Sequence, residues 1–306
     1  MDQNFSKRDH LRGLGLRPHH YEQWLKAPPP SIFYLEAISE NYLGHKGGPA
    51  LYYLQKIKEK YTLLLHGVGL NIGAAEPLDK EYLKELKKLI ELLNPRIISD
   101  HLSFSALDGK HSHSLLPLPR NAETLQFVAK KISQVQNELG RNIAFENISR
   151  YISYHNDDLS EMEFTSEILN LTGAKLLLDV NNLYVTCTNT GQDPYTELSY
   201  LNHKHVAQYH IAGHENHEDY LYDTHSGAID PSVWELLDAA IAICQEAPII
   251  LEQDDHHSLE TAIQYWDKDP QNVRRSRKFE RDAKIHVGNH AKFALPPSSK
   301  NSPLNL

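Results

Sequence analysis

The sequence predicts an α/β fold, a single-domain (β/α)8 TIM barrel followed by a basic C-terminal tail. Two observations carry this prediction: short β-branched or leucine-rich runs alternate with longer amphipathic stretches, and eight such runs occur over about 255 of the 306 residues. A doubly wound sheet is the alternative fold. A doubly wound sheet that binds a dinucleotide usually has a glycine-rich first turn. Here Gly13-Leu-Gly15 is followed by Leu-Arg-Pro-His-His, which does not match that dinucleotide-binding motif.

Strands are expected where apolar runs meet turn residues. The eight predicted strands are Gly13 to Arg17, Ser31 to Glu36, Tyr61 to His66, Arg96 to His101, Asn142 to Asn147, Lys175 to Val180, His205 to Ile211 and Pro248 to Gln253.

Helices are expected between these strands, where start and stop signals bracket an amphipathic pattern. Asp79 begins a stretch with leucines at three-and-four spacing that Pro95 stops, and Asn121 begins another that runs to Gly140. The remaining predicted helices are Ser160 to Leu171, Asp193 to Leu201 and Ser232 to Gln245.

Charge divides the chain into two parts. Residues 268–306 hold nine Lys or Arg and three Asp or Glu, a charge of +6. Because the whole chain carries −9, residues 1–267 carry −15. We expect residues 1–267 to form the barrel domain and residues 268–306 to be a flexible extension or a docking arm for an acidic partner. The acidic body argues against a nucleic-acid partner.

Targeting signals are not evident. No run of eighteen apolar residues occurs, and the first residues lack a basic region followed by an apolar one, so we expect neither a membrane protein nor a secreted precursor. Two cysteines, Cys187 and Cys244, are too few for a disulfide framework, which favours the cytoplasm. We interpret both as small apolar positions rather than catalytic thiols.

Imidazole and carboxylate groups end most of the predicted strands, and in this fold the carboxyl ends of the strands form the active-site face. Each of them alone has a structural explanation, as a helix cap or a hydrogen-bonded core residue. Together, four carboxylates and four imidazoles around one barrel mouth would carry a high desolvation cost without a cation. The sequence therefore predicts a metal site, with candidate ligands His66, His101, Glu146, Asp179, His210, Asp223, His225 and Glu252.

The type and number of ligands narrow the choice of metal. Imidazole and carboxylate without thiolate suit iron, manganese or zinc. Eight ligands exceed what one ion uses when a position stays open for substrate, so two or three ions bridged by carboxylates such as Glu146 or Glu252 fit better.

The order of motifs resembles a known family. The runs that carry the likeness are GLGLRPHHY from Gly13, SEN from Ser39, LHGVGL from Leu65, SDHL from Ser99, LLPLP from Leu115, EN from Glu146, LDVNN from Leu178 and HIAGH from His210. They are similar to the multinuclear non-haem iron-dependent oxidative enzymes, a long uncharacterised family that includes the iron subunit of methanobactin biosynthesis. The resemblance covers about residues 11 to 267.

This resemblance implies a barrel that holds two or three irons and uses molecular oxygen to modify cysteine residues of a ribosomally made precursor peptide, often with a separate peptide-recognition partner protein. The eight candidate ligands match the family's ligand pattern. Among them we expect Glu146, Asp179 and His210 to act in catalysis. Zinc or manganese could replace iron in a recombinant sample.

Polar neighbours of the ligands are expected to orient them or to meet the substrate. We place Asp100, Asn147 and Asn182 behind the ligands. Glu36, Asn41, His19 and His20 are expected at the rim as substrate contacts, with bracing of the barrel as the alternative for the two histidines. Arg17 is expected to brace the barrel.

Two other functions compete. A zinc or manganese hydrolase or isomerase of the sugar-isomerase and apurinic-endonuclease barrels would also use such ligands, and Asp223-Thr-His225 is close to the endonuclease pattern. Against it, Asp179-Val-Asn-Asn182 stands where Asp-x-x-His would be expected, and the body is acidic. The third possibility is a non-catalytic metal-binding protein.

Overall fold

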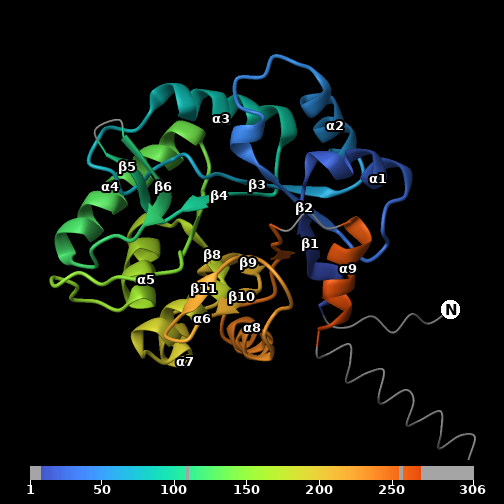
Figure 1. The fold of residues 1–306 in the computed structure, drawn as a ribbon. Helices are drawn as coiled ribbons and strands as arrows, with labels where there is room; N and C mark the ends of the chain where they lie inside the picture. Colours follow the sequence, from blue (N-terminus) through green and yellow to red (C-terminus); the bar gives the residue numbers. More distant parts are fainter. Residues whose placement is uncertain (1–7, 108–109, 255–257, 270–306) are drawn as a thin grey trace, which may run out of the picture. The chain divides into compact units, whose positions relative to one another are not determined.

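The computed structural model describes residues 8–107, 110–254 and 258–269. A closed barrel of parallel strands, in the order β1-β12-β9-β8-β7-β4-β3-β2, confirms the predicted fold class and all eight predicted strands (Figure 1). The barrel strands are β1 (Arg12–Gly15), β2 (Tyr34–Ile38), β3 (Thr62–His66), β4 (Ile97–His101), β7 (Ala144–Glu146), β8 (Lys175–Asp179), β9 (Val206–Ile211) and β12 (Ile249–Leu251).

The inside of the barrel has an apolar floor. Tyr34, Leu64 and Ile250 form a buried cluster with Ile97 packed against it, separate from the main core. Gly13 leaves room for this floor, because a Cβ at that position would overlap the side chain of Ile250 and lie 2.9 Å from Cβ of Tyr34. Side chains alternate along a strand, so residues two positions further on point into the same interior, nearer the carboxyl ends.

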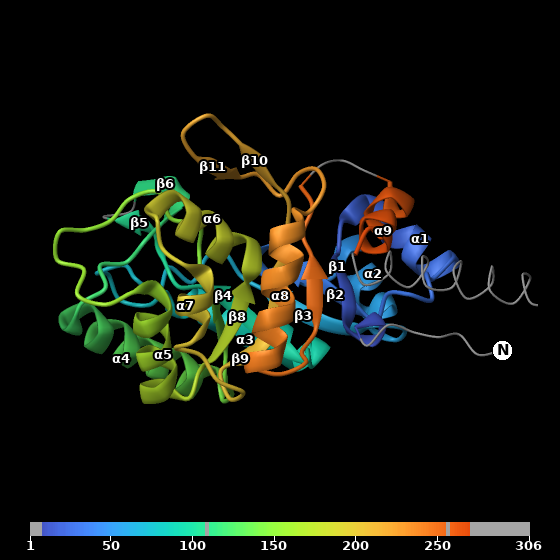
Figure 2. The same cartoon turned by 90° about the horizontal axis from the view of Figure 1, so that it is seen from below.

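An outer ring of helices covers the barrel (Figures 1 and 2). They are α1 (Tyr21–Lys26), α2 (Pro49–Lys58), α3 (Lys80–Leu93), α4 (Ala122–Leu139), α5 (Glu161–Thr172), α6 (Val180–Thr190), α7 (Pro194–Leu198), α8 (Pro231–Ile243) and α9 (Leu259–Asp267). The five predicted helices are all present.

Caps explain why the predicted helices begin where they do. The side chain of Asp79 accepts hydrogen bonds from the backbone N–H groups of Glu81 and Tyr82, and Asn121 accepts one from Thr124. Ser160 forms a capping box with Glu163. These contacts satisfy amide groups that a helix leaves free at its start.

Helices α1, α2, α6 and α9 were not predicted. Helix α6 follows β8 without a loop, and its Val, Asn and Thr residues have low helix propensity. Burial of one face stabilises it, including Leu183 and Cys187. Cys187 and Cys244 are both buried, and burial raises the pKa of their thiols to about 12 and about 11, in keeping with apolar packing positions.

Two β-hairpins were also not predicted, β5 (Phe104–Leu107) with β6 (Lys110–Leu116) and β10 (His214–Asn216) with β11 (Leu221–Asp223). Figure 2 shows β10 and β11 projecting beyond the barrel strands. Asn189 of α6 holds this hairpin, since its side chain donates to the carbonyl of Leu221 (2.9 Å) and accepts from the N–H of Leu221 (2.8 Å).

In the described part of the chain, no helix is long and apolar enough to cross a membrane. The predicted basic extension, residues 268–306, lies outside the described residues except for its first two. The boundary after residue 267 stays a prediction.

Candidate metal centre

Six predicted ligands come together where the barrel strands end. His66, His101, Glu146 and Asp179 are the last residues of β3, β4, β7 and β8; His210 lies in β9, and Glu252 follows β12. The strand register places His101 beside Glu146 and Asp179 beside His210. Asp179 and His210 have no exposed surface, so this part of the cluster is shielded from water.

Glu146 lies at the middle of the cluster. Its Oε2 is 3.2 Å from Nε2 of His66 and 3.3 Å from Nε2 of His101. Its Oε1 is 3.2 Å from Nδ1 of His210. One carboxylate therefore faces two different sets of imidazoles, which is the arrangement of a bridging ligand.

Glu252 links His210 to a second, outer group. Its Oε1 is 3.3 Å from Nδ1 of His210, and its Oε2 is 3.6 Å from Nδ1 of His225. His225 in turn places Nε2 3.2 Å from Oδ1 of Asp223. All eight predicted ligands thus belong to one continuous cluster, in which Asp223, His225 and Glu252 are the most exposed members.

Ligand atoms approach closely enough for metal binding in two groups. Within each group they lie within 4.8 Å of one another. The groups are His66, His101 and Glu146, and then Glu146, Asp179, His210 and Glu252.

Asp179 combines a structural and a chemical role. Its Oδ1 accepts a hydrogen bond from the N–H of Asn182 (2.7 Å) and so caps α6. Its Oδ2 is buried and accepts no hydrogen bond from the described residues. Burial, followed by the nearby carboxylates of Glu146, Glu252 and Asp223, raises the pKa of Asp179 well above its usual value.

The electrostatics of the cluster fit a cation. Burial lowers the pKa of His210, but the carboxylates of Glu252, Glu36 and Glu146 outweigh it and raise that pKa well above its usual value. Oε2 of Glu146 and Oε2 of Glu252, like Oδ2 of Asp179, are buried and receive no hydrogen bond from any residue that the structure describes. Metal ions would give these oxygens partners and offset the crowded negative charge.

The three residues that we expected behind the ligands form hydrogen bonds with backbone groups and not with the imidazole rings of the ligands. Asn147 donates to the carbonyl of Asp179 and accepts from its N–H, both at 2.9 Å, while Asn182 donates to the carbonyl of Asn147 (3.0 Å). Asp100 accepts from the N–H groups of His101 (2.7 Å) and Leu70 (3.1 Å), and burial raises its pKa to about 7.

Glu36 is not at the rim, so that expectation was wrong. Strand β2 continues to Ile38, and Glu36 is buried inside the barrel with Oε1 2.9 Å from Nε2 of His210. Its Oε2 accepts a hydrogen bond from Gln208. Glu36 therefore lies behind His210, on the side of the ring opposite to Glu146 and Glu252.

Sequence reasoning missed four polar residues of the centre: Ser99, Asn181, Gln208 and His214. Oγ of Ser99 is 2.9 Å from Nδ1 of His66 and donates to the carbonyl of Leu65 (3.3 Å), which leaves Nε2 of His66 toward Glu146. Asn181 donates to Oδ1 of Asp223 (2.9 Å), and its Oδ1 is 2.7 Å from Nδ1 of His214. Three of the four stand inside motifs quoted above, and Gln208 lies two residues before His210 on the same strand face.

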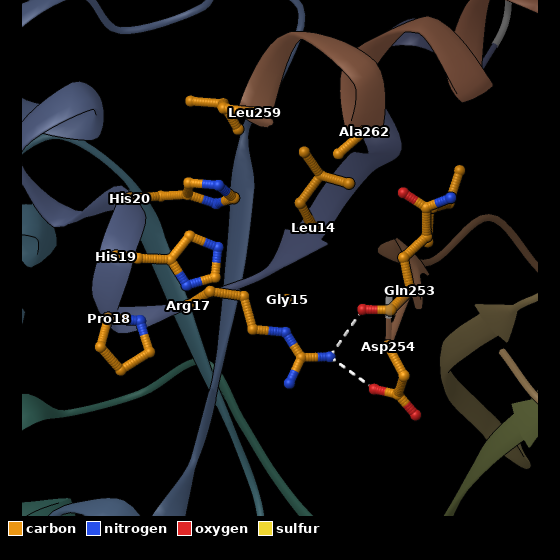
Figure 3. Close-up of a pocket in the computed structure, with 11 residues that line it drawn as sticks. Leu14, Gly15, Arg17, Pro18, His19, His20, Gln253, Asp254, Leu259 and Ala262 are labelled. Atoms are coloured by element: carbon orange, nitrogen blue, oxygen red, sulfur yellow. Dashed lines mark hydrogen bonds and ion pairs between the residues drawn. The ribbon is translucent and has the colours of Figure 1, made fainter. Parts of the chain in front are cut away.

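Three of the remaining rim residues, Arg17, His19 and His20, line a cavity of about 240 Å³ (Figure 3). Of the two histidines, only His19 is exposed. Arg17 donates to the carbonyl of Gln253 (2.8 Å) and to Asp254 (2.7 Å), so it braces the ends of β1 and β12 as expected. Asn41 is exposed at the end of the short helix Ser39–Asn41.

The barrel is similar to solved structures of sugar isomerases and epimerases. An L-ribulose 3-epimerase matches with a TM-score of 0.54 and 13% identity, over 93% of this chain and 99% of that chain. A xylose isomerase domain containing protein from Salmonella typhimurium matches with a TM-score of 0.57 and 10% identity, over 88% and 98%. At these identities the likeness is one of fold.

Sequence comparison is more specific. A UPF0276 protein of Acaryochloris marina is 41% identical over 242 residues, which is 79% of this chain and 87% of that protein. A UPF0276 protein of Caulobacter vibrioides is 38% identical over 243 residues, 79% and 86% of the two chains. The model of the family described as RiPP precursor modification enzyme MbnB/TglH/ChrH matches residues 11–265, nearly the whole barrel. RiPPs are ribosomally made, post-translationally modified peptides, and this chain belongs to the MbnB/TglH/ChrH family of enzymes that modify their precursors.

Proposed function

We propose that this precursor-modifying enzyme is a multinuclear non-haem iron enzyme that uses molecular oxygen to oxidise cysteine residues of its peptide substrate. The observation that carries the proposal is Glu146, whose two buried oxygens face different imidazoles. The resemblance of the ordered motifs to the iron-dependent oxidative enzymes supports iron and oxygen. The reaction would take place in the cytoplasm, with a separate protein that recognises the peptide.

The ligands divide into three groups, and the first two share the carboxylate of Glu146. His66, His101 and Oε2 of Glu146 would hold one ion. Asp179, His210, Oε1 of Glu146 and Oε1 of Glu252 would hold a second. Asp223 and Nε2 of His225, next to Glu252, would hold a third, the most exposed of the three. Imidazole and carboxylate suit iron, and they also admit zinc or manganese in a recombinant sample.

Bound iron would supply Lewis acidity toward the substrate thiolate and one-electron chemistry with oxygen. The protein's own residues prepare the site for this. Asn147 fixes the backbone of Asp179, Ser99 fixes the ring of His66, and Glu36 holds the far side of His210. Such contacts raise the precision and basicity of metal ligands. At the rim, His19, His20 and Asn41 would contact the substrate.

The test is metal analysis of the full chain purified without oxygen, followed by spectroscopy as air is added. We expect two or three irons per chain that oxidise on exposure, and oxygen consumption when a cysteine-containing peptide is supplied. The same protein loaded with zinc is the matched control, and it should consume no oxygen.

Two results would overturn the proposal. Stoichiometric zinc or manganese that stays inert to oxygen after reconstitution with ferrous iron would point to hydrolysis or isomerisation. Variable, loosely held metal with no oxygen consumption would point to a non-catalytic metal-binding protein.

A further inference from the structure

We infer that an exposed aromatic surface beside the metal centre binds the segment of the precursor peptide next to its reacting residue, and that this segment carries basic and apolar side chains. The surface, here called the aromatic ledge, consists of Tyr151, His217, Tyr220 and Tyr222. The inference rests on the peptide-modifying function above and adds where the peptide lies.

The rings of the ledge form one continuous row. Tyr151, in the loop between β7 and α5, lies 5.9 Å from Tyr222 on β11, measured between ring centroids. Tyr222 lies 6.4 Å from Tyr220, and His217 stacks on Tyr220 at 4.9 Å. Two segments far apart in the sequence thus build a single surface.

These rings are unusually exposed for their size. Tyr151, Tyr220 and Tyr222 expose 45%, 46% and 48% of their surface, and Ile152, which follows Tyr151 in the chain, exposes 52%. Single exposed apolar residues are ordinary, but a contiguous set marks a binding surface. Tyrosine is also well suited to contact, because it offers a large ring with few rotatable bonds.

The inner end of the ledge touches the metal centre. The hydroxyl of Tyr151 accepts a hydrogen bond from the backbone N–H of Asp223 (2.9 Å), and Tyr222 precedes Asp223 in β11. A peptide that reaches the centre from this side therefore has to cross the ledge. This continuity favours the substrate itself over a separate partner protein as the occupant.

Charge indicates which peptide would bind. Apart from the candidate ligand Asp223, residues 214–223 of the hairpin contain the acidic residues Glu215, Glu218 and Asp219 and no Lys or Arg. Glu215 has 57% of its side chain exposed, 3.4 Å from His217. Lysine or arginine side chains would pair with these carboxylates and pack on the tyrosine rings, while apolar side chains would cover the rest of the ledge.

The test compares two synthetic fluorescein-labelled peptides of equal length, each with one cysteine, by fluorescence polarisation with the zinc-loaded full chain. The cysteine is preceded by alternating Lys and Leu in one peptide and by alternating Glu and Ser in the other. The ledge variant carries Tyr220→Thr and Tyr222→Thr, and the matched control carries Tyr52→Thr and Tyr195→Thr, two exposed tyrosines elsewhere. A third variant reverses charge with Glu218→Lys and Asp219→Lys.

We expect the Lys/Leu peptide to bind wild type and the control equally, and the ledge variant at least about tenfold more weakly. The charge-reversed variant should lose affinity for the Lys/Leu peptide and gain it for the Glu/Ser peptide. Equal binding by wild type and the ledge variant would overturn the inference and leave a partner protein as the occupant. The inference would also be overturned if wild type bound the Glu/Ser peptide more tightly than the Lys/Leu peptide, or if it bound neither peptide.

Zinc content and thermal unfolding, measured on every sample, separate this inference from the proposed function. A wild-type chain that binds its metal but not the Lys/Leu peptide counts against the ledge alone. Intact ledge binding in a chain that takes up no iron counts against the iron chemistry alone.

Discussion

Glu146 is the residue on which the candidate centre depends most. It is buried, it ends the short strand β7, and its carboxylate separates His66 and His101 from His210. A neutral side chain of the same size could keep the packing but could not bridge two cations.

The variant Glu146→Gln should therefore lose at least one metal ion per chain and lower activity by at least about 100-fold, while the barrel stays folded. Elemental analysis and circular dichroism measure both effects. The matched control is Glu167→Gln, the same chemical change at an exposed position of α5, outside the metal cluster. Full metal occupancy in Glu146→Gln would show that our ligand assignment is wrong.

At the scale of elements, buried ion pairs hold the loop between β7 and α5, which carries Tyr151. Arg120 pairs with Asp157 at 2.5 Å, and Arg150 lies 3.6 Å from Glu161. Glu197 accepts hydrogen bonds from Ser160 and from the N–H of Met162, and so fixes the start of α5. Breaking this network would disturb a loop that borders the metal centre.

The network has a pH dependence that can be measured. Burial raises the pKa of Glu161 to about 7, against the opposing effect of Arg150. Between these two pKa values the folded state keeps a proton that the unfolded state has released. The free energy of unfolding therefore falls as pH rises from 4.5, the ordinary pKa of Glu161, to about 7. The contribution is on the order of 3 kcal/mol, from about 1.4 kcal/mol per pKa unit.

In the metal-free protein, Glu161→Gln should remove this loss, so the difference in unfolding free energy between variant and wild type should change across pH 4 to 7. Urea unfolding at several pH values measures it. Glu167→Gln, an exposed change on the same helix, should leave the profile of wild type unaltered. Parallel profiles for Glu161→Gln and wild type would contradict the raised pKa.

At the scale of the whole molecule, the barrel concentrates carboxylates at one end. Glu146, Asp179, Asp223 and Glu252 come from elements spread over more than a hundred residues of sequence. Ligand binding stabilises a fold by mass action, about 2.7 kcal/mol at a metal concentration 100 times Kd. Metal removal should therefore lower the unfolding temperature of the whole barrel.

The variant Asp179→Asn distinguishes two effects of this residue on stability: repulsion between its carboxylate and its acidic neighbours, and metal binding. The amide oxygen can still cap α6, and the neutral group removes repulsion by Glu146 and Glu252, so the metal-free variant should be at least as stable as metal-free wild type. Added ferrous iron or zinc should stabilise it less than wild type. Thermal unfolding with and without chelator measures both. A variant that is less stable without metal, yet responds fully to metal, would contradict this account.

The sequence by itself determined the barrel and the eight residues of the cluster. Parallel strands buried on both faces are short apolar runs that can be recognised locally, and their carboxyl ends all meet at one mouth. His66, His101, Glu146, Asp179 and His210 could therefore be grouped before their distances were known. Caps such as Asp79 and Ser160 are equally local signals, which is why α3 and α5 begin within one residue of the prediction.

Only the tertiary structure decided the features that depend on register and long-range packing. Strand β2 continues two residues past Glu36, which moves this carboxylate from the rim to a place behind His210. Helix α6 forms against its own propensities because it is buried, and the β10–β11 hairpin depends on Asn189. The aromatic ledge joins Tyr151 to Tyr222, residues on separate segments. No local pattern encodes such contacts, because their stability comes from groups that only the folded chain brings together.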